Sequence, residues 1–224
     1  MYRRLSHTIT QDTPRSSPLV APLEVAPVLE LARGDNSNLY RVALTNHYGT
    51  HIDAPNHFHA AGLRLVDLPG EAFVFHAPCV LDVPKGDLGL ITPEDLAPHE
   101  GRAAGSDLVM LRTGFGALRA SDPVRYASRN PGLSGEAAAY LVERFPLLRC
   151  LALDTISLEW TSDDSHGWAA HRVLLGQRDR PVLVIEDLCL DFGGRTPGRV
   201  FAFPLLVDGV DSFPCTVLGE FADA

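Results

Sequence analysis

The chain has 224 residues, 46% hydrophobic and 21% charged, which is enough apolar material for one sizeable core. Its 19 basic and 28 acidic residues give a formal net charge of −9, and no long run of Lys and Arg stands out, which excludes a typical nucleic-acid-binding surface. No apolar stretch approaches the ~18 residues of a membrane span, and the start lacks the apolar run of a signal peptide. We therefore expect a cytoplasmic protein without a membrane partner, folded as one domain over residues 1–224.

The first predicted element is an extended segment over residues 47–53. Gly49 and the β-branched residues that follow it disfavour a helix there. Because side chains of an extended backbone alternate between two faces, His47, His51 and Asp53 project from the same side. Imidazole and carboxylate ligands together suit zinc, manganese or iron, and three such ligands leave positions open for water and substrate. The segment therefore predicts a metal site.

Short apolar runs bounded by Gly, Pro or Asp predict the strands of a buried sheet. These runs span residues 73–83, 108–112, 150–154, 182–185 and 200–207. After the last run, Asp208 and Gly209 predict a turn into residues 215–218, and the two segments on either side of it would form an antiparallel pair.

Helices are fewer, and three segments carry helix signals. Residues 92–96 begin with a threonine cap, a proline and two acids. Residues 134–144 form the clearest helix, capped by a serine and stopped before Pro146, and residues 169–175 form a shorter helix that carries His171. Strands and helices interleaved in one domain predict the α/β or α+β class.

The pattern His-x-Gly-Thr-His-x-Asp-Ala-Pro-x-His-Phe over residues 47–58 resembles the signature of the cyclase family of metal-dependent hydrolases, which includes bacterial kynurenine formamidases and isatin hydrolases. Further matches cover nearly the whole chain and lie at residues 5–9, 105–114, 131–134, 153–157, 171–175 and 181–188. The resemblance implies a β/β/α arrangement with a mixed, partly barrel-like sheet, which periodicity alone does not select. It also implies a homodimer.

The same resemblance implies roles for individual residues. A first metal would be bound by His47, His51 and Asp53. A second metal would be bound by His171, with Asp53 and Glu186 as bridging ligands, and His57 would act as general acid and base. The implied cofactor is a divalent metal, Zn²⁺ or Mn²⁺, with one or two ions per chain.

The ligand set also predicts a reaction. A divalent metal lowers the pKa of bound water from about 15.7 toward ~7 and polarises a carbonyl oxygen, so metal-bound hydroxide is the expected nucleophile. His57 would pass a proton to the leaving nitrogen. We expect a hydrolase that cleaves an amide bond of a small molecule, either an aryl formamide such as N-formylkynurenine or a cyclic amide such as isatin. Hydrolysis of a lactone or ester, or a polyketide-type cyclisation, fits the same ligands.

Aromatic residues near the motif segments are the candidates for an apolar wall against the substrate. They are Tyr48, Phe58, Trp160 and Trp168.

Two segments depart from the family pattern. Residues 11–18 contain no aromatic side chain where family members often carry one, and residues 212–215 stand where a Pro-x-Arg pattern is expected.

Two other classes of protein stay open. His51, Asp53 and the distant His171 also fit the facial triad of a non-haem iron oxygenase, with Arg180 to hold an oxo-acid cosubstrate. That interpretation leaves the remaining candidate residues without a role. The second alternative is a non-catalytic relative that binds metal for a structural or regulatory purpose. The two departures favour it, whereas an intact His57 opposes it because a mere binder needs no proton shuttle.

Overall fold

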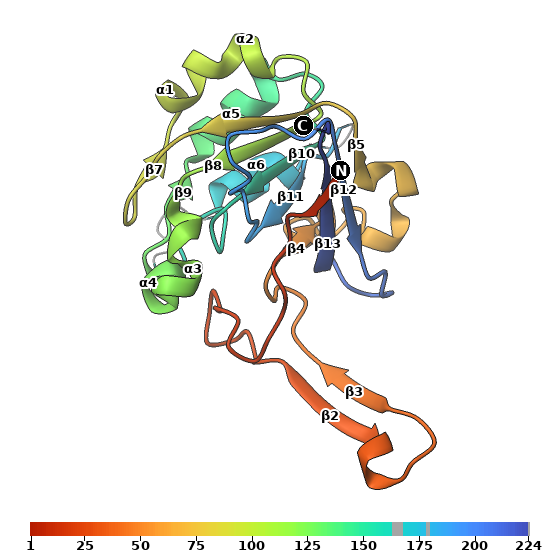
Figure 1. Ribbon diagram of the computed structural model, residues 1–224. Helices are drawn as coiled ribbons and strands as arrows, with labels where there is room; N and C mark the ends of the chain where they lie inside the picture. The colour runs from red at the N-terminus through yellow and green to blue at the C-terminus, as the bar shows by residue number, and fades with distance from the viewer. Residues whose placement is uncertain (163–167, 178–179, 224) are drawn as a thin grey trace.

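The computed structural model of the chain describes residues 1–162, 168–177 and 180–223. Among these residues, nine strands form a mixed, nearly closed and partly barrel-like sheet at the centre of the molecule (Figure 1). The neighbouring parallel strands are β6 (Pro78–Asp82), β8 (Leu108–Arg112), β10 (Cys150–Leu153) and β11 (Leu183–Glu186). The strands that pair antiparallel are β4 (His51–Asp53), β13 (Ser212–Glu220), β12 (Arg199–Pro204), β5 (Val74–Phe75) and β1 (Tyr2–Arg4). The mixed α/β class and the partly barrel-like sheet are confirmed.

Both faces of the parallel strands are buried. Val109 belongs to an apolar cluster that includes residues of helices α5 (Gly135–Arg144) and α6 (Ala169–Leu175), and the next residue, Met110, belongs to a second cluster built with β4, β12 and β13. Because each strand packs on two sides, its sequence is a continuous apolar run rather than an alternation of apolar and polar residues.

The predicted helices are present with the predicted starts. Helix α5 begins after Ser134, whose hydroxyl accepts a hydrogen bond from the backbone N–H of Ala137 at 3.0 Å. Helix α1 (Pro93–Leu96) begins after Thr92, whose backbone N–H donates to the carboxylate of Asp95 at 2.8 Å. The other short helices are α2 (Glu100–Ala103), α3 (Leu118–Ser121) and α4 (Pro123–Ser128). Turns of 3₁₀ helix lie at Leu31–Arg33, Pro55–His57, Leu65–Asp67, Gly70–Phe73, Ala97–His99 and Phe115–Ala117.

The run predicted as one strand over residues 73–83 is two strands, β5 and β6. The interruption falls at His76 and Ala77, whose backbone N–H groups donate to the carboxylate of Asp107 at 2.8 and 2.9 Å instead of to a neighbouring strand. The remaining predicted runs correspond to β8, β10, β11 and β12. The predicted turn connects β12 and β13, which pair antiparallel as expected, and Gly209 in it has φ +88°.

The segment over residues 47–53 is a strand only from His51 onward, so the expectation of one continuous strand is wrong. Gly49 has φ +67°, a backbone conformation that glycine adopts readily, and the chain bends at this point. The bend directs Tyr48 into the core, where its hydroxyl donates to the carbonyl of Thr10 at 2.8 Å. His47 therefore reaches the site from a loop rather than from the strand.

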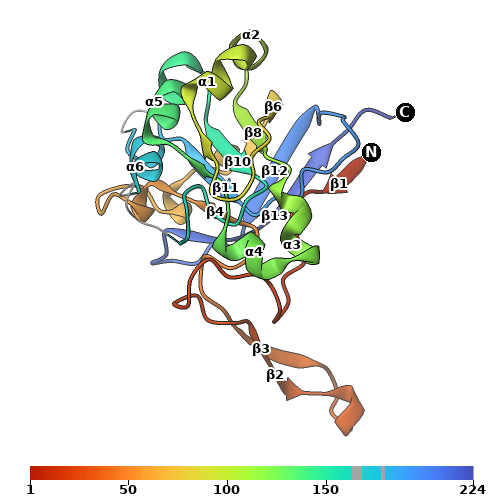
Figure 2. The same cartoon turned by 90° about the vertical axis from the view of Figure 1, so that its left-hand side faces the viewer.

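Two small sheets were not among the predicted strands. Strands β2 (Glu24–Leu29) and β3 (Leu39–Ala43) form an antiparallel hairpin, here called the arm (residues 24–43), which projects away from the main sheet (Figures 1 and 2). Strands β7 (Leu90–Ile91) and β9 (Gly132–Leu133) form a short parallel pair. Within the described part of the chain, no helix has the length and apolar character needed to span a membrane.

Candidate metal centre

Neighbouring strands place three of the predicted ligands side by side. Strand β4 carries His51 and Asp53, and strand β11 pairs with it so that Glu186 lies directly opposite His51. Side chains opposite each other in an antiparallel pair are close neighbours. The Nε2 atom of His51 lies 3.2 Å from Oε2 of Glu186 and 3.5 Å from Oδ1 of Asp53, and all three side chains are buried. The Nδ1–H of His51 donates to the carbonyl of Gly49 at 2.8 Å, which leaves Nε2 facing the carboxylates.

His47 joins this group from the loop before β4. Its Nδ1 atom lies 3.3 Å from Oδ1 of Asp53, and its Nε2 atom lies 2.8 Å from the hydroxyl oxygen of Ser212. Ser212 is the register partner of Asp53 on β13, so the sheet also positions the residue that holds the imidazole. The ring is thus fixed on one side by Ser212 while its other nitrogen faces the cluster.

His171 reaches the cluster from helix α6. Its Nε2 atom lies 3.3 Å from Oε1 of Glu186, and its Nδ1–H donates to Oε2 of Glu159 at 2.6 Å. The backbone N–H of Ala170 donates to the other oxygen of Glu159 at 3.2 Å. A buried carboxylate that accepts from Nδ1–H fixes the tautomer and leaves Nε2 with a free lone pair, which is the usual arrangement for a metal-binding histidine.

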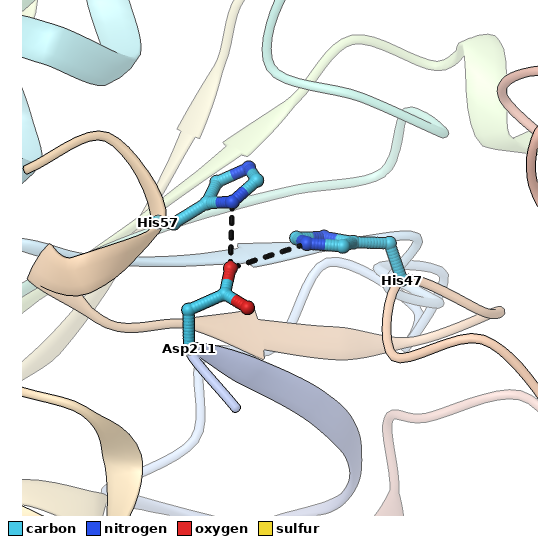
Figure 3. A group of neighbouring side chains, drawn as sticks. All are labelled: His47, His57 and Asp211. Atoms are coloured by element: carbon cyan, nitrogen blue, oxygen red, sulfur yellow. Dashed lines mark ion pairs between the residues drawn. The ribbon is translucent and has the colours of Figure 1, made fainter. Parts of the chain in front are cut away.

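His57 lies at the end of the Pro55–His57 turn, and its side chain is partly exposed. Its Nδ1 atom lies 2.7 Å from Oδ2 of Asp211, an ion-pair distance, and the same oxygen lies 3.4 Å from Nε2 of His47. Figure 3 shows Asp211 between the two rings, with one carboxylate oxygen facing both. The ring of His57 lies 5.9 Å from the ring of His171, so the structure brings all six predicted site residues together.

Asp187, the residue after Glu186, anchors the end of β11. It is buried, has φ +57°, and receives two hydrogen bonds from the guanidinium of Arg119 at 2.6 and 2.7 Å. The hydroxyl of Tyr126, itself fully buried, donates to Oδ1 of Asp187 at 2.7 Å. In addition, the hydroxyl of Thr50 donates to the backbone carbonyl of Asp187 at 2.5 Å. These bonds fix the chain on the far side of Glu186.

The charges of the cluster shift its pKa values. Burial lowers the pKa of His47, but the neighbouring carboxylates, Asp53 foremost, outweigh burial and raise it to about 10. Burial also lowers the pKa of His171, whereas its hydrogen bonds to Glu159 and Glu186 raise it to about 9. The pKa values of Asp53 and Glu186 are lowered by the same imidazoles, against the effect of burial. The cluster therefore favours positive charge at its centre.

The residues fit a divalent metal. Among the described residues, Nε2 of His51 and both carboxylate oxygens of Asp53 are buried polar atoms without a hydrogen-bond partner, an arrangement that costs stability unless something else satisfies them. One potential ligand atom each from His47, His51 and Asp53 lie within 4.8 Å of one another, and the same holds for Asp53, His57 and His171. Imidazole nitrogens and carboxylate oxygens in this number suit Zn²⁺ or Mn²⁺.

The four aromatic candidates lie in different places. Phe58 stacks on the ring of His171 at 4.8 Å between centroids, and Trp168 lies 6.2 Å from Phe58 and 6.0 Å from His171. Trp160 lies against Gly132, and Tyr48 is fully buried, with no surface open to a ligand. Phe58 and Trp168 are therefore the aromatic candidates beside the site.

Glu159, Asp211 and Ser212 contact the site and were not among the predicted site residues. Asp211 and Ser212 follow the predicted turn at Gly209, so a search for polar residues at the start of that strand could have found them. The departure from the family pattern at residues 212–215 coincides with a residue that touches His47. No spacing in the sequence points to Glu159, because its partner is twelve residues away on a helix.

Arg180, considered above for an oxo-acid cosubstrate, is engaged elsewhere. Its guanidinium donates to the backbone carbonyls of Val142, Phe145, Pro146 and Leu148, at 2.7 to 3.1 Å, and so closes the end of helix α5. The non-haem iron oxygenase interpretation consequently loses the side chain that it required for the cosubstrate.

A family model with the description "Putative cyclase" matches residues 3–160. The chain belongs to the putative cyclase family. Among the relatives of this cyclase chain, the kynurenine formamidase of Paracidovorax citrulli is 29% identical over 182 residues, which cover 79% of this chain and 77% of the relative. An uncharacterized protein of Haemophilus influenzae is 37% identical over 106 residues, which cover 47% of this chain and 75% of the relative.

Solved structures show the same fold. Isatin hydrolase A from Labrenzia aggregata, bound to benzyl benzoate, superimposes with a TM-score of 0.82 at 24% identity, covering 97% of this cyclase chain and 92% of that chain. Isatin hydrolase A from Ralstonia solanacearum gives a TM-score of 0.79 at 20% identity, covering 97% and 90%. At these identities the likeness concerns the fold.

Proposed function

We propose that this cyclase-family protein is a metal-dependent hydrolase that cleaves an amide bond of a small molecule. The observation that carries the proposal is a buried cluster of imidazoles and carboxylates. Within the described part of the chain, His51 Nε2 and the Asp53 carboxylate in it have no hydrogen-bond partner. Membership of the family and the likeness to a kynurenine formamidase support it. We further propose Zn²⁺ or Mn²⁺ as the cofactor, with one or two ions per chain.

The roles of the residues follow from their positions. His47, His51 and Asp53 would hold one ion, and His171 with Glu186 would hold a second. The two ions would be neighbours, because His51 of the first group lies 3.2 Å from Glu186 of the second. A bound divalent metal acidifies water and polarises a carbonyl oxygen. His57 lies at the partly exposed edge of the cluster with Nδ1 facing Asp211, so its other nitrogen can accept a proton from water and deliver it to the leaving nitrogen.

The substrate class is proposed from the aromatic side chains and the relatives. Phe58 and Trp168 offer an apolar wall next to His171, which suits a flat aromatic substrate. An aryl formamide such as N-formylkynurenine and a cyclic amide such as isatin both combine a flat ring with an amide carbonyl. Lactone or ester hydrolysis and polyketide-type cyclisation are the alternative reactions of the same site. A non-catalytic metal-binding role is the alternative of another class.

The test combines metal analysis with a substrate panel. Protein stripped with a chelator is reloaded with Zn²⁺ or Mn²⁺, its metal content is measured, and N-formylkynurenine, isatin and a lactone are offered. We expect amide hydrolysis that depends on the metal. His57→Ala should keep the metal and lose activity by ~10²–10⁴-fold, whereas His51→Ala should lose metal and activity together. A metal-loaded protein that hydrolyses no substrate, or a fully active His57→Ala variant, would refute the proposal, and hydrolysis of the lactone alone would favour the ester alternative.

We also propose that the chain is a homodimer and that the arm is its contact surface. A two-stranded hairpin is at best marginally stable on its own. The arm nevertheless exposes seven large apolar side chains, each between 37% and 58% exposed. These are Val25, Val28, Leu29, Leu31, Leu39, Tyr40 and Val42. Together they present on the order of 600 Å², against the ~800 Å² that each partner buries in a stable interface.

The charge of the arm favours a second copy as its partner. Residues 24–43 contain three acidic and two basic side chains, 2 − 3 = −1, whereas the whole chain has a net charge of −9. Two arms can therefore meet without the repulsion that the remainder of the chain would generate.

The test is the molar mass in solution, measured by light scattering after gel filtration. The wild type should have the mass of a dimer, and the double variant Leu31→Asp, Val42→Asp should have the mass of a monomer. Leu19→Asp, at a site 89% exposed outside the arm, is the control. A wild-type monomer, or a double variant that stays dimeric, would contradict the proposal.

A further inference from the structure

Asp211 is not among the predicted site residues, although it directly precedes β13 and contacts His57. Both of its carboxylate oxygens are held. Oδ1 accepts a hydrogen bond from the side-chain amide of Asn46 at 3.0 Å, and Oδ2 lies at an ion-pair distance of 2.7 Å from Nδ1 of His57. Its backbone carbonyl accepts from the N–H of Ala54 at 3.0 Å, which continues the pairing between β13 and β4. Asp211 is therefore a carboxylate in a fixed place.

A fixed carboxylate decides which nitrogen of a neutral imidazole carries the proton. A carboxylate accepts but does not donate when it is ionised, so a ring that faces it with Nδ1 keeps its proton on Nδ1. The lone pair is then on Nε2, at the other end of the ring. The ring is also confined between neighbours, because its centroid lies 4.2 Å from that of His47 and 4.6 Å from that of Phe58 (Figure 3 shows the His47 side).

We propose that Asp211 is a positioning residue that holds His57 as the Nδ1–H tautomer, so that Nε2 is the atom that exchanges a proton with the substrate. This inference rests on the proposed function, because it specifies how His57 serves the hydrolysis. One ring nitrogen of His57 lies within 4.8 Å of potential ligand atoms of Asp53 and His171, which places the imidazole at the edge of the metal cluster. Asp211 acts only through His57 and touches no substrate.

The alternative is that Asp211 serves the metal ligand His47, whose Nε2 lies 3.4 Å from the same carboxylate oxygen. Ser212 makes the shorter contact to that nitrogen, at 2.8 Å, and it remains when Asp211 is replaced. The two roles predict different results. Loss of a support for His47 would lower the zinc content, whereas loss of a support for His57 would leave the zinc content unchanged and reduce turnover.

The first experiment is a double-mutant cycle on the zinc-loaded full chain. Asp211→Ala should lower kcat by ~10–100-fold, the range typical for removal of a side chain that orients the residues of a metal site, with little change in KM and with full zinc content. In the His57→Ala background the same substitution should change the residual activity less than about threefold. Asp208→Ala on the same turn is the matched control, because that side chain is exposed and bonds only to Arg64 among the described residues.

The second experiment reads the tautomer directly and does not depend on activity. Nitrogen-15 NMR of histidine-labelled, zinc-loaded protein assigns the His57 signals by their loss in His57→Ala. The wild type should show the Nδ1–H form, and Asp211→Ala should shift His57 toward the Nε2–H form. An unchanged tautomer, a fall in zinc content, or an equal loss of activity in the His57→Ala background would overturn the inference. If the wild type hydrolyses no substrate, the proposed function fails, while the tautomer measurement still decides the role of Asp211.

Discussion

Replacement of Glu159 tests whether the carboxylate behind His171 contributes to metal binding. The Oε2 atom of Glu159 lies 2.6 Å from Nδ1 of His171, and both side chains are buried. A hydrogen bond that involves a charged group contributes ~1.5–3 kcal/mol. Since about 1.4 kcal/mol corresponds to a factor of ten in an equilibrium constant, the loss of this bond should weaken zinc binding by roughly 10–100-fold, which agrees with the typical effect of removing such a partner.

The two replacements of Glu159 should differ in degree. Glu159→Gln keeps the volume and one acceptor oxygen, so we expect the smaller loss, and Glu159→Ala should show the larger one. Zinc affinity is measured by competition with a coloured chelator, and thermal unfolding checks that each variant is folded. Glu136→Gln in the first turn of α5, where the side chain is exposed, is the control. A folded Glu159→Ala variant with the affinity of the wild type would refute the reasoning.

Three further predictions concern stability. Tyr126→Phe removes the buried hydrogen bond to Asp187 and should lower the free energy of unfolding by ~1.5–3 kcal/mol in urea titrations; an unchanged value would show that Arg119 alone satisfies the carboxylate. Gly49→Ala should cost ~1–2 kcal/mol because φ is +67°, whereas Gly70→Ala, with open space around it, should cost far less, and equal effects would contradict the role given to the bend. In chelator-treated protein the folded-state pKa values of His47 and His171, about 10 and about 9, lie above the ordinary value of ~6.5. The folded state then binds more protons than the unfolded state, so this stabilisation is complete below about pH 6.5 and is lost as the pH rises through 9 to 10; urea midpoints that rise over that range would contradict it.

Much of the fold could be predicted because local rules act on short segments. The apolar runs of β8 and β10 and the serine cap of α5 are features of the residues themselves. The interruption between β5 and β6 could not be predicted, because it depends on Asp107, which lies thirty residues further along the chain. The arm was missed because Pro27 interrupts the apolar run of β2 and Arg41 interrupts that of β3, so neither segment has the pattern of a core strand.

The candidate site divides in the same way. The grouping of His47, His51 and Asp53 is visible within seven residues of sequence. The placement of His171 and Glu186 beside them came from the family resemblance, and the structure brings these groups together through the register of β4 and β11. Glu159 lay beyond prediction, because a hydrogen bond across the tertiary fold, rather than spacing, brings it to His171. Asp211 follows the predicted turn, but only the fold shows that it lies next to His57.

The pairing of His51 with Glu186 has a consequence for how the protein matures. The two strands come from parts of the chain that are synthesised far apart in time, and a slip of one residue between them would leave the two side chains on opposite faces of the sheet. A misaligned chain could not assemble the cluster of ligands. A divalent ion that binds the cluster would therefore stabilise only molecules whose strands are correctly aligned.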